Sequence, residues 1–176
     1  MLDMITMNSM VVRKIIVEKE FVMGLDMYFS AKKYMSKYFD KADVERIEKI
    51  NDIFGVTGIE DEDYGAQEVI FRVAYWRKAN AIHKWFVDNC QDGRDECQET
   101  WVSREQMQQL IDLCKEVLAD RNKADQLLPT AQGFFFGGTT YDEWYERDLE
   151  YTVERFEKIL ADPAFAKSDF YYQSSW

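Results

Sequence analysis

The chain is poor in the residues that most often carry catalysis or covalent cross-links. Its 176 residues include one histidine, three cysteines and two prolines. An odd and sparse set of cysteines does not make a disulfide framework, so we expect reduced thiols, as in the cytosol. His83, Cys90 and Cys97 are evenly spaced, whereas zinc ligands usually come in pairs about two to four residues apart. We therefore predict no metal and no other cofactor.

Long apolar runs are also missing. No stretch reaches the roughly 18 apolar residues that a membrane span requires. Residues 1–21 interrupt their apolar stretch with charges and lack a small-residue cleavage site, unlike a secretory signal. We expect a cytoplasmic protein that does not contact a membrane.

Positive charge is scarce. The chain has 22 Lys and Arg residues but 33 Asp and Glu residues, which gives a formal net charge of −11. Proteins that bind nucleic acids hold the phosphates with clustered Lys and Arg side chains, so we predict no direct nucleic-acid contact. A negative surface keeps a protein soluble, which is the simpler explanation, and it can also steer the protein toward basic partners.

Apolar and aromatic side chains, in contrast, are abundant. Hydrophobic residues make up 47% and aromatic residues 15% of the chain, a composition typical of a folded globule. Alternating apolar residues predict strands, and apolar residues at helical spacing predict helices. The expected strands are 25–29, 68–76, 101–102, 134–136 and 169–176; the expected helices are 41–54, 78–89, one that begins after Ser103 and one over 141–160 capped by Thr140. We predict an α+β fold, with a single mixed or antiparallel sheet of about four strands packed with about four helices.

No linker rich in Ser, Gly or Pro divides the chain, so residues 23–176 are predicted to form a single α+β domain. Residues 1–22 are interpreted as a dispensable N-terminal extension, because Met23 immediately precedes the first convincing strand. Residues 10–17 have strand propensity and are a candidate for an extra edge strand. Such an edge, together with the aromatic C-terminus, favours a homodimer. The acidic stretch 55–67 is predicted to be a mobile loop.

The densest group of candidate functional residues lies at a predicted strand-to-helix junction, in residues 76–86. Three basic side chains gather there in an otherwise acidic chain, and cations beside free helix N–H groups favour anion binding. A second interpretation assigns the histidine of this segment to the buried stripe of the helix. The predicted ligand-binding residues are Trp76, Arg77, Lys78, Asn80, His83 and Lys84, with Tyr172 and Trp176 from the chain end closing the site.

Two further features have the composition of a site but lack its pattern. Residues 133–140 are glycine-rich but lack the lysine and the spacing of a phosphate-binding loop. Asp142 and Glu143 are chemically able to act as acid and base, yet they sit where a helix start normally keeps acidic residues. The single histidine has no serine or cysteine partner in a recognisable motif. We therefore expect a binding protein rather than an enzyme.

Four strings in the sequence resemble those of one family. They are MGLDMY at 23–28, YWRKANAIHKWFVDN at 75–89, GFFFGGTTYDEWY at 133–145 and YYQSSW at 171–176. On these strings, residues 23–176 resemble an uncharacterised family of small phage and prophage proteins. The resemblance implies a phage origin and a location in the host bacterial cytosol, and it implies no catalytic activity. Phage accessory proteins of this size often act against host defences. The resemblance associates the chain with that class of proteins, without pointing to particular residues.

Three functions follow as hypotheses. The first is a non-catalytic, anti-CRISPR-like counter-defence protein, whose acidic surface binds a host defence protein with a basic groove. The second is a protein that binds and sequesters an anionic, nucleotide-like small molecule at the junction site. The third is a hydrolase in which His83 is the general base, which requires an accessible imidazole in a concave site beside an orienting carboxylate.

Overall fold

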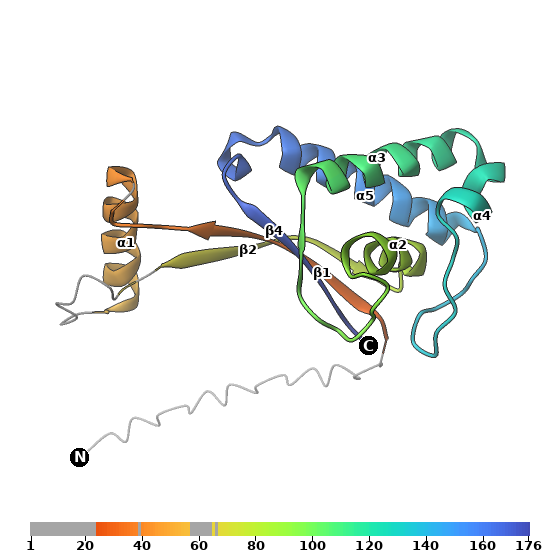
Figure 1. Ribbon diagram of the computed structural model, residues 1–176, viewed down its shortest axis with the longest axis horizontal. Coiled ribbons are helices and arrows are strands. Elements are labelled where there is room, and N and C mark those ends of the chain that lie inside the picture. Colours follow the sequence, from red (N-terminus) through yellow and green to blue (C-terminus); the bar gives the residue numbers. More distant parts are fainter. Residues whose placement is uncertain (1–23, 39, 57–64, 66) are drawn as a thin grey trace, which may run out of the picture.

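The structure, a computed structural model, describes residues 24–38, 40–56, 65 and 67–176 (Figure 1). Within these residues the chain forms one antiparallel sheet of four strands and five α-helices, which confirms the predicted α+β class. In chain order the elements are β1 (Asp26–Tyr34), α1 (Lys41–Phe54), β2 (Glu68–Arg77), α2 (Asn80–Cys90), β3 (Thr100–Val102), α3 (Arg104–Ala119), α4 (Ala124–Leu127), α5 (Glu143–Ala161) and β4 (Asp169–Ser175), with 3-10 turns at Arg121–Lys123 and Pro163–Phe165.

Strand β1 organises the sheet, because the alternation of its side chains creates one buried face. Met27, Phe29 and Ala31 are fully buried, and the residues between them point to the opposite face. β1 pairs antiparallel with β2 on one side and with β4 on the other, and the short β3 pairs with β4. The strand order is therefore β2-β1-β4-β3.

Three helices, α2, α3 and α5, cover the buried face. The Phe29 ring lies 6.0 Å from that of Phe86 in α2 and 4.8 Å from that of Phe156 in α5, measured between ring centroids. α3 packs alongside α5 (Figure 1). Ser103 caps α3 through a capping box with Gln106, as the sequence predicts. The buried stripe of α3 is Met107, Leu110, Ile111, Cys114 and Val117.

Helix α1 stands apart from these helices, at the far end of the β1–β2 pair (Figure 1). Asp40 caps its start, and Gly55, with a φ of 65°, ends it in the left-handed conformation that glycine favours. Residues 57–64 of the predicted loop, and the predicted extension 1–22 with its candidate strand at 10–17, lie outside the described residues. No helix in the described part of the chain is both long and apolar enough to cross a membrane.

The predicted strand at 134–136 is wrong, because these residues form a turn outside the sheet. Their backbone groups bond elsewhere: the Phe135 carbonyl accepts from the Leu25 N–H at 3.0 Å, and the Phe136 carbonyl accepts from the Asn80 side chain at 3.1 Å. A segment whose carbonyls are used in this way cannot also pair with a neighbouring strand.

The predicted start of the longest helix is also wrong. α5 begins at Glu143 and is capped by Asp142, whose carboxylate accepts from the N–H groups of Trp144 and Tyr145. Thr140, the predicted cap, instead donates its hydroxyl to the Asp142 carboxylate at 2.8 Å. A carboxylate is favoured at this place because it meets the positive end of the helix dipole.

Candidate functional site

A cleft of about 350 Å³ opens where the end of β2 and the start of α2 face the first turns of α5. A volume of this size falls in the range of roughly 300–1,000 Å³ that small-molecule sites occupy. Three segments line it: residues 77–82 from the β2–α2 junction; Thr130, Gly137, Gly138 and Thr140 from the preceding loop; and Asp142, Trp144, Tyr145, Asp148 and Leu149 from α5 and its cap.

The turn between β2 and α2 has a strained backbone. Lys78 has a φ of 62°, a left-handed conformation that costs a non-glycine residue about 1–2 kcal/mol. Its N–H donates to the Leu25 carbonyl at 2.8 Å, and its carbonyl accepts from the Asn80 N–H at 2.9 Å. These bonds hold Lys78 in the strained conformation. Strain of this kind clusters at binding and catalytic sites.

Helix α2 begins in the cleft wall without a capping side chain. Ala79 precedes the helix and offers no side-chain acceptor, and the first turn contains no acidic residue. The first N–H groups of a helix lack partners within the helix and carry partial positive charge. The α2 side is therefore the electropositive wall of the cleft.

The Lys78 side chain adds a full positive charge beside this helix end. Its stem runs between two glycines: a methyl group on Gly137 would lie 3.2 Å from Lys78 Cβ, and one on Gly24 would lie 3.1 Å from Lys78 Cε. Gly137 also has a φ of 86°, so a side chain there would be strained as well as crowded. Arg77 lines the cleft too, with a guanidinium nitrogen close to Gly24.

Asn80 holds the loop that closes the cleft. The residue is 5% exposed, and its Nδ2 donates to the carbonyls of Phe136 at 3.1 Å and Gly138 at 2.7 Å. Its Oδ1 accepts from the Ala131 N–H at 3.1 Å. Since both amide hydrogens and the carbonyl are used, Asn80 positions the cleft wall and does not offer a free group to a ligand.

The α5 wall contains two carboxylates in different states. A hydrogen bond from the Thr140 hydroxyl, with further bonds from backbone N–H groups, lowers the pKa of Asp142. Asp148 lies further along the same helix and is partly buried; this burial, and then the charge of Asp142, raises the pKa of its carboxyl to about 7. Asp148 is therefore divided between its two protonation states at neutral pH, and it can donate or accept a hydrogen bond.

A tryptophan stands at the rim of this wall. Trp144 is 70% exposed, although it lies within the first turn of α5 and lines the cleft. The Arg147 guanidinium covers one face of the indole, 5.0 Å from the ring centroid. A large ring exposed beside a cleft is a ready contact surface for a planar ligand.

Some of the predicted site residues do not reach the cleft. Lys84 lies further along α2, where its Nζ pairs with Asp88 at 2.7 Å. Trp76 is a core residue, 2% exposed, and its Nε1 donates to the Thr152 hydroxyl at 2.9 Å. The predicted residues that the structure brings together at the cleft are Arg77, Lys78 and Asn80.

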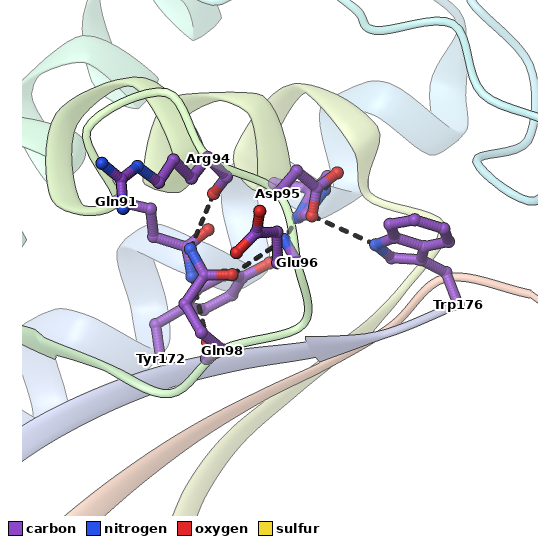
Figure 2. A network of polar contacts seen from close by, with 8 residues as sticks. Gln91, Arg94, Asp95, Glu96, Gln98, Tyr172 and Trp176 are labelled. Carbon is purple, nitrogen blue, oxygen red and sulfur yellow. Dashed lines mark hydrogen bonds and ion pairs between the residues drawn. The ribbon is translucent and has the colours of Figure 1, made fainter.

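The remaining three, His83, Tyr172 and Trp176, belong to a separate network, in which Figure 2 labels Tyr172, Trp176 and Asp95. His83 Nδ1 lies 2.7 Å from the Tyr172 hydroxyl, and His83 Nε2 lies 2.9 Å from the Asp95 carboxylate. Asp95 also accepts from Trp176 Nε1 at 3.1 Å. A carboxylate can only accept, so in the neutral imidazole Nε2 donates to Asp95 and Nδ1 accepts from Tyr172. Burial, and then the charge of Asp95, raises the pKa of Tyr172 well above its ordinary value.

This network gives His83 a structural role. The residue is 1% exposed, does not line the cleft, and has both ring nitrogens occupied. A general base needs a free nitrogen within reach of a substrate, which His83 does not have here. The imidazole instead ties the loop between α2 and β3, and the end of the chain, to α2.

Asp148 and Trp144 were not predicted from the sequence. They lie four residues apart on α5, so both face the same side of the helix. A signal was available for Asp148, because it sits next to Leu149 and four residues before Thr152, which are buried positions of that helix. A carboxylate beside an apolar stripe is partly removed from water, which raises its pKa.

No protein-family model, curated protein or solved structure matches the chain. The resemblance to small phage proteins therefore stays a prediction, and function has to be inferred from the site itself.

Proposed function

We propose that the cleft binds a small anionic molecule that carries a planar ring, such as a nucleotide, and does not transform it. The observation that carries this proposal is the uncapped start of α2, which borders the cleft beside Lys78. Partial positive charge from helix N–H groups and full charge from a lysine favour a phosphate or carboxylate at one place. Strained backbone conformations cluster at binding sites, so the left-handed conformation of Lys78 supports this proposal.

The exposed indole of Trp144 supports the ring of the ligand. Stacking of a base on an aromatic side chain contributes about 1–3 kcal/mol and tolerates different bases. Trp144 and the α2 start line the same cleft, so one ligand of nucleotide size can contact both.

The Asp148 carboxyl can take up a proton when a ligand binds. In its neutral form the carboxyl donates a hydrogen bond to an anionic oxygen, whereas the ionised form repels it. Because its pKa is about 7, a bound anion favours the protonated form and binding takes up a proton. Binding is therefore expected to be tighter below neutral pH than above it.

A thermal-shift screen against mono-, di- and cyclic nucleotides tests the proposal. At 100 times its Kd a ligand stabilises the folded state by about 2.7 kcal/mol, which raises the Tm by roughly 5–10 °C in a protein of this size. Lys78→Ala should weaken binding at least tenfold. Lys84→Ala is the matched control, since it removes the same charge from α2 outside the cleft and should bind as the unaltered protein does. If no nucleotide raises the Tm and native mass spectrometry finds no bound anion, the proposal fails.

A second candidate function, the binding of a basic host protein in counter-defence, is supported by the loop between α2 and β3. Asp92 and Glu96 are exposed acidic residues of this loop. Hydrogen bonds hold the part of the loop that carries Glu96 (Figure 2). Gln98 Nε2 donates to the Arg94 carbonyl at 2.7 Å, and the Glu96 N–H donates to Gln98 Oε1 at 2.8 Å. A preorganised loop loses less conformational freedom on binding, which favours association.

Pull-down from the bacterial host with the immobilised full chain tests this second function. Glu96→Lys should lose a partner that the unaltered chain retains, and salt should elute that partner because the contact is electrostatic. Glu150→Lys, an equally large charge change at an exposed position of α5, is the control and should retain it. A retained partner that is insensitive to both salt and Glu96→Lys would contradict this function.

A further inference from the structure

A second hollow adjoins the cleft, in the loop between α4 and α5. It is wide and shallow, with a volume of about 550 Å³, whereas the cleft measures about 350 Å³. We call it the loop hollow, and its lining residues are Gln132, Gly133, Phe134, Gly137, Gly138 and Thr139. Gly137 and Gly138 also line the cleft, so the two spaces meet at this pair of glycines.

The glycine pair leaves the way between the two spaces open. A methyl group on Gly138 would meet only the Thr140 hydroxyl among the described residues, at 3.8 Å, so it would point into open space. Against Gly137 lies the stem of Lys78, whose Cβ is 3.2 Å from the place of a methyl group. The basic side chain therefore begins where the cleft and the loop hollow meet. An anion held by Lys78 can belong to a ligand that extends into both.

Phe134 lines the loop hollow with almost its whole ring in solvent. It is 94% exposed, the largest exposed fraction among the large apolar side chains that the structure describes. Single exposed apolar side chains are common on protein surfaces and need no explanation by themselves. This one, however, borders a space that is continuous with a cleft, and the cleft has an exposed ring of its own, Trp144.

The loop holds the Phe134 ring outward while the ring two residues later turns inward. The Phe136 ring packs on His83, with 5.0 Å between centroids, and the Phe136 N–H donates to the Gly133 carbonyl at 3.1 Å. A methyl group on Gly133 would lie 2.5 Å from Phe136 Cγ, so this turn requires glycine. The Thr130 hydroxyl donates to the Thr139 carbonyl at 3.0 Å and closes the base of the loop. A loop that is already held in place loses little conformational freedom when a ligand binds.

We infer that the cleft and the loop hollow together bind a dinucleotide, with its phosphate linkage at Lys78 and one base in each space. The inference rests on the proposed function, which places an anion beside Lys78 and a ring on Trp144, and it adds a second ring on Phe134. A base stacks through its π face, so the second base needs no hydrogen-bond partner in the loop hollow. Pyrophosphate and phosphodiester linkages both place a base on either side of a negative charge, so dinucleotides of both kinds share the required chemistry.

Calorimetric titration of the full chain with ADP and with two adenosines joined by a pyrophosphate tests the inference. Both ligands contain the pyrophosphate, and the dinucleotide carries less negative charge than ADP, so tighter binding reports the second base rather than charge. We expect the Kd of the dinucleotide to be about tenfold lower than that of ADP. The second arm compares AMP with two adenosines joined by a phosphodiester. The linkage that gives the larger gain identifies the kind of dinucleotide that the site takes.

Variants of Phe134 locate the second base. Phe134→Ala should raise the Kd of the dinucleotide about tenfold, to that of ADP, and should leave the Kd of ADP within twofold. Phe134→Trp keeps a flat ring at this position and should retain tight binding. Phe54→Ala is the matched control, because it removes a ring that is 78% exposed on α1 and lines neither space, and it should change neither Kd. All three substitutions are at exposed positions, so the variants should fold.

The ADP titration separates failure of this inference from failure of the proposed function. If the mononucleotides bind but the second base gives no gain in either arm, the ligand ends within the cleft and this inference is overturned alone. A gain that Phe134→Ala does not reduce would also overturn it, because the second base would then lie elsewhere. If neither the mononucleotides nor the dinucleotides bind, the proposed function fails and this inference fails with it.

Discussion

Helix α2 takes part in two regions, the network around His83 and the cleft beside Lys78. The two regions differ in how their polar groups are satisfied. In the network, both nitrogens of His83 and both oxygens of Asp95 have partners, and the ring is buried. In the cleft, no described residue hydrogen-bonds or ion-pairs with the Lys78 ammonium group or the Asp148 carboxyl. A complete network stabilises a fold, whereas unused polar groups in a cleft are available to a ligand.

Residue type is therefore a weaker guide to a site than the state of its hydrogen bonds. Histidine is the side chain most often used in acid–base chemistry, yet here it joins a loop to a helix. Asp148 is one of 33 acidic residues and has no motif around it, yet burial raises the pKa of its carboxyl to about 7. The comparison predicts opposite responses to mutation in the two regions.

The largest effect is expected for His83→Ala. The substitution leaves a cavity and removes the partner of the buried Tyr172 hydroxyl, so the free energy of unfolding should fall by about 3 kcal/mol. Urea denaturation measures this loss, with Lys84→Ala, expected within about 0.5 kcal/mol of the unaltered protein, as the control. Ligand affinity should be unchanged in His83→Ala. A stable variant that no longer binds would show that the two regions are not separate.

Asn80→Ala should act on both stability and binding. It leaves the carbonyls of Phe136 and Gly138 and the Ala131 N–H without their partner, which costs about 2 kcal/mol. Because the loop then loses its anchor, nucleotide affinity should fall as well. Urea denaturation and calorimetric titration of the same preparation measure both quantities. Loss of stability with full affinity would mean that the loop does not shape the binding surface.

Asp148→Asn should stabilise the protein, with a dependence on pH. Burial raises the carboxyl pKa from its ordinary value to about 7, so the folded state keeps a proton that the unfolded chain releases. The contribution of Asp148 is therefore most favourable at about pH 4 and is lost as the pH rises through 7. Allowing for contact with solvent, the variant should exceed the unaltered protein by about 2 kcal/mol at pH 8 and match it at pH 4. An equal difference at both pH values would contradict this assignment.

The smallest effect on stability is expected for Lys78→Gly. Glycine adopts a φ of 62° without strain. The relief of backbone strain offsets the loss of side-chain contacts and the greater conformational entropy of the unfolded chain. The free energy of unfolding should stay within about 1 kcal/mol of the original. Nucleotide affinity should fall at least tenfold, because the ammonium group is gone. A stable Lys78→Gly variant that binds normally would remove Lys78 from the site.

Much of the fold could be predicted from the sequence, because most elements have a strong periodic signal. The alternation around Met27 and the helical spacing in α3 each depend on local pattern, and both are found in the structure. The strand predicted at 134–136 was wrong for a non-local reason. Its aromatic residues have strand propensity, but their backbone partners come from Leu25 and Asn80, far away in the sequence.

The site was predictable only in part, and for the same reason. Arg77, Lys78 and Asn80 lie within four consecutive residues, so their grouping at a strand-to-helix junction could be inferred. The opposite wall comes from α5, and nothing local indicates that Trp144 and Asp148 face that junction. Tyr172 and Trp176 were expected to close the site, but β4 pairs between β1 and β3. Tyr172 in this strand reaches His83, and Trp176, which follows the strand, reaches Asp95.

The decisive measurement is calorimetric titration of the nucleotide that binds most tightly, at pH 6 and at pH 8. If the cleft binds the anion and Asp148 takes up a proton, affinity should fall by roughly tenfold between pH 6 and pH 8. The phosphate also titrates near pH 6, so Asp148→Asn is the reference, and it should show only the small change that the phosphate produces. The same pH dependence in both proteins, or affinity that Lys78→Ala does not alter, would contradict the assignment of the cleft as the binding site.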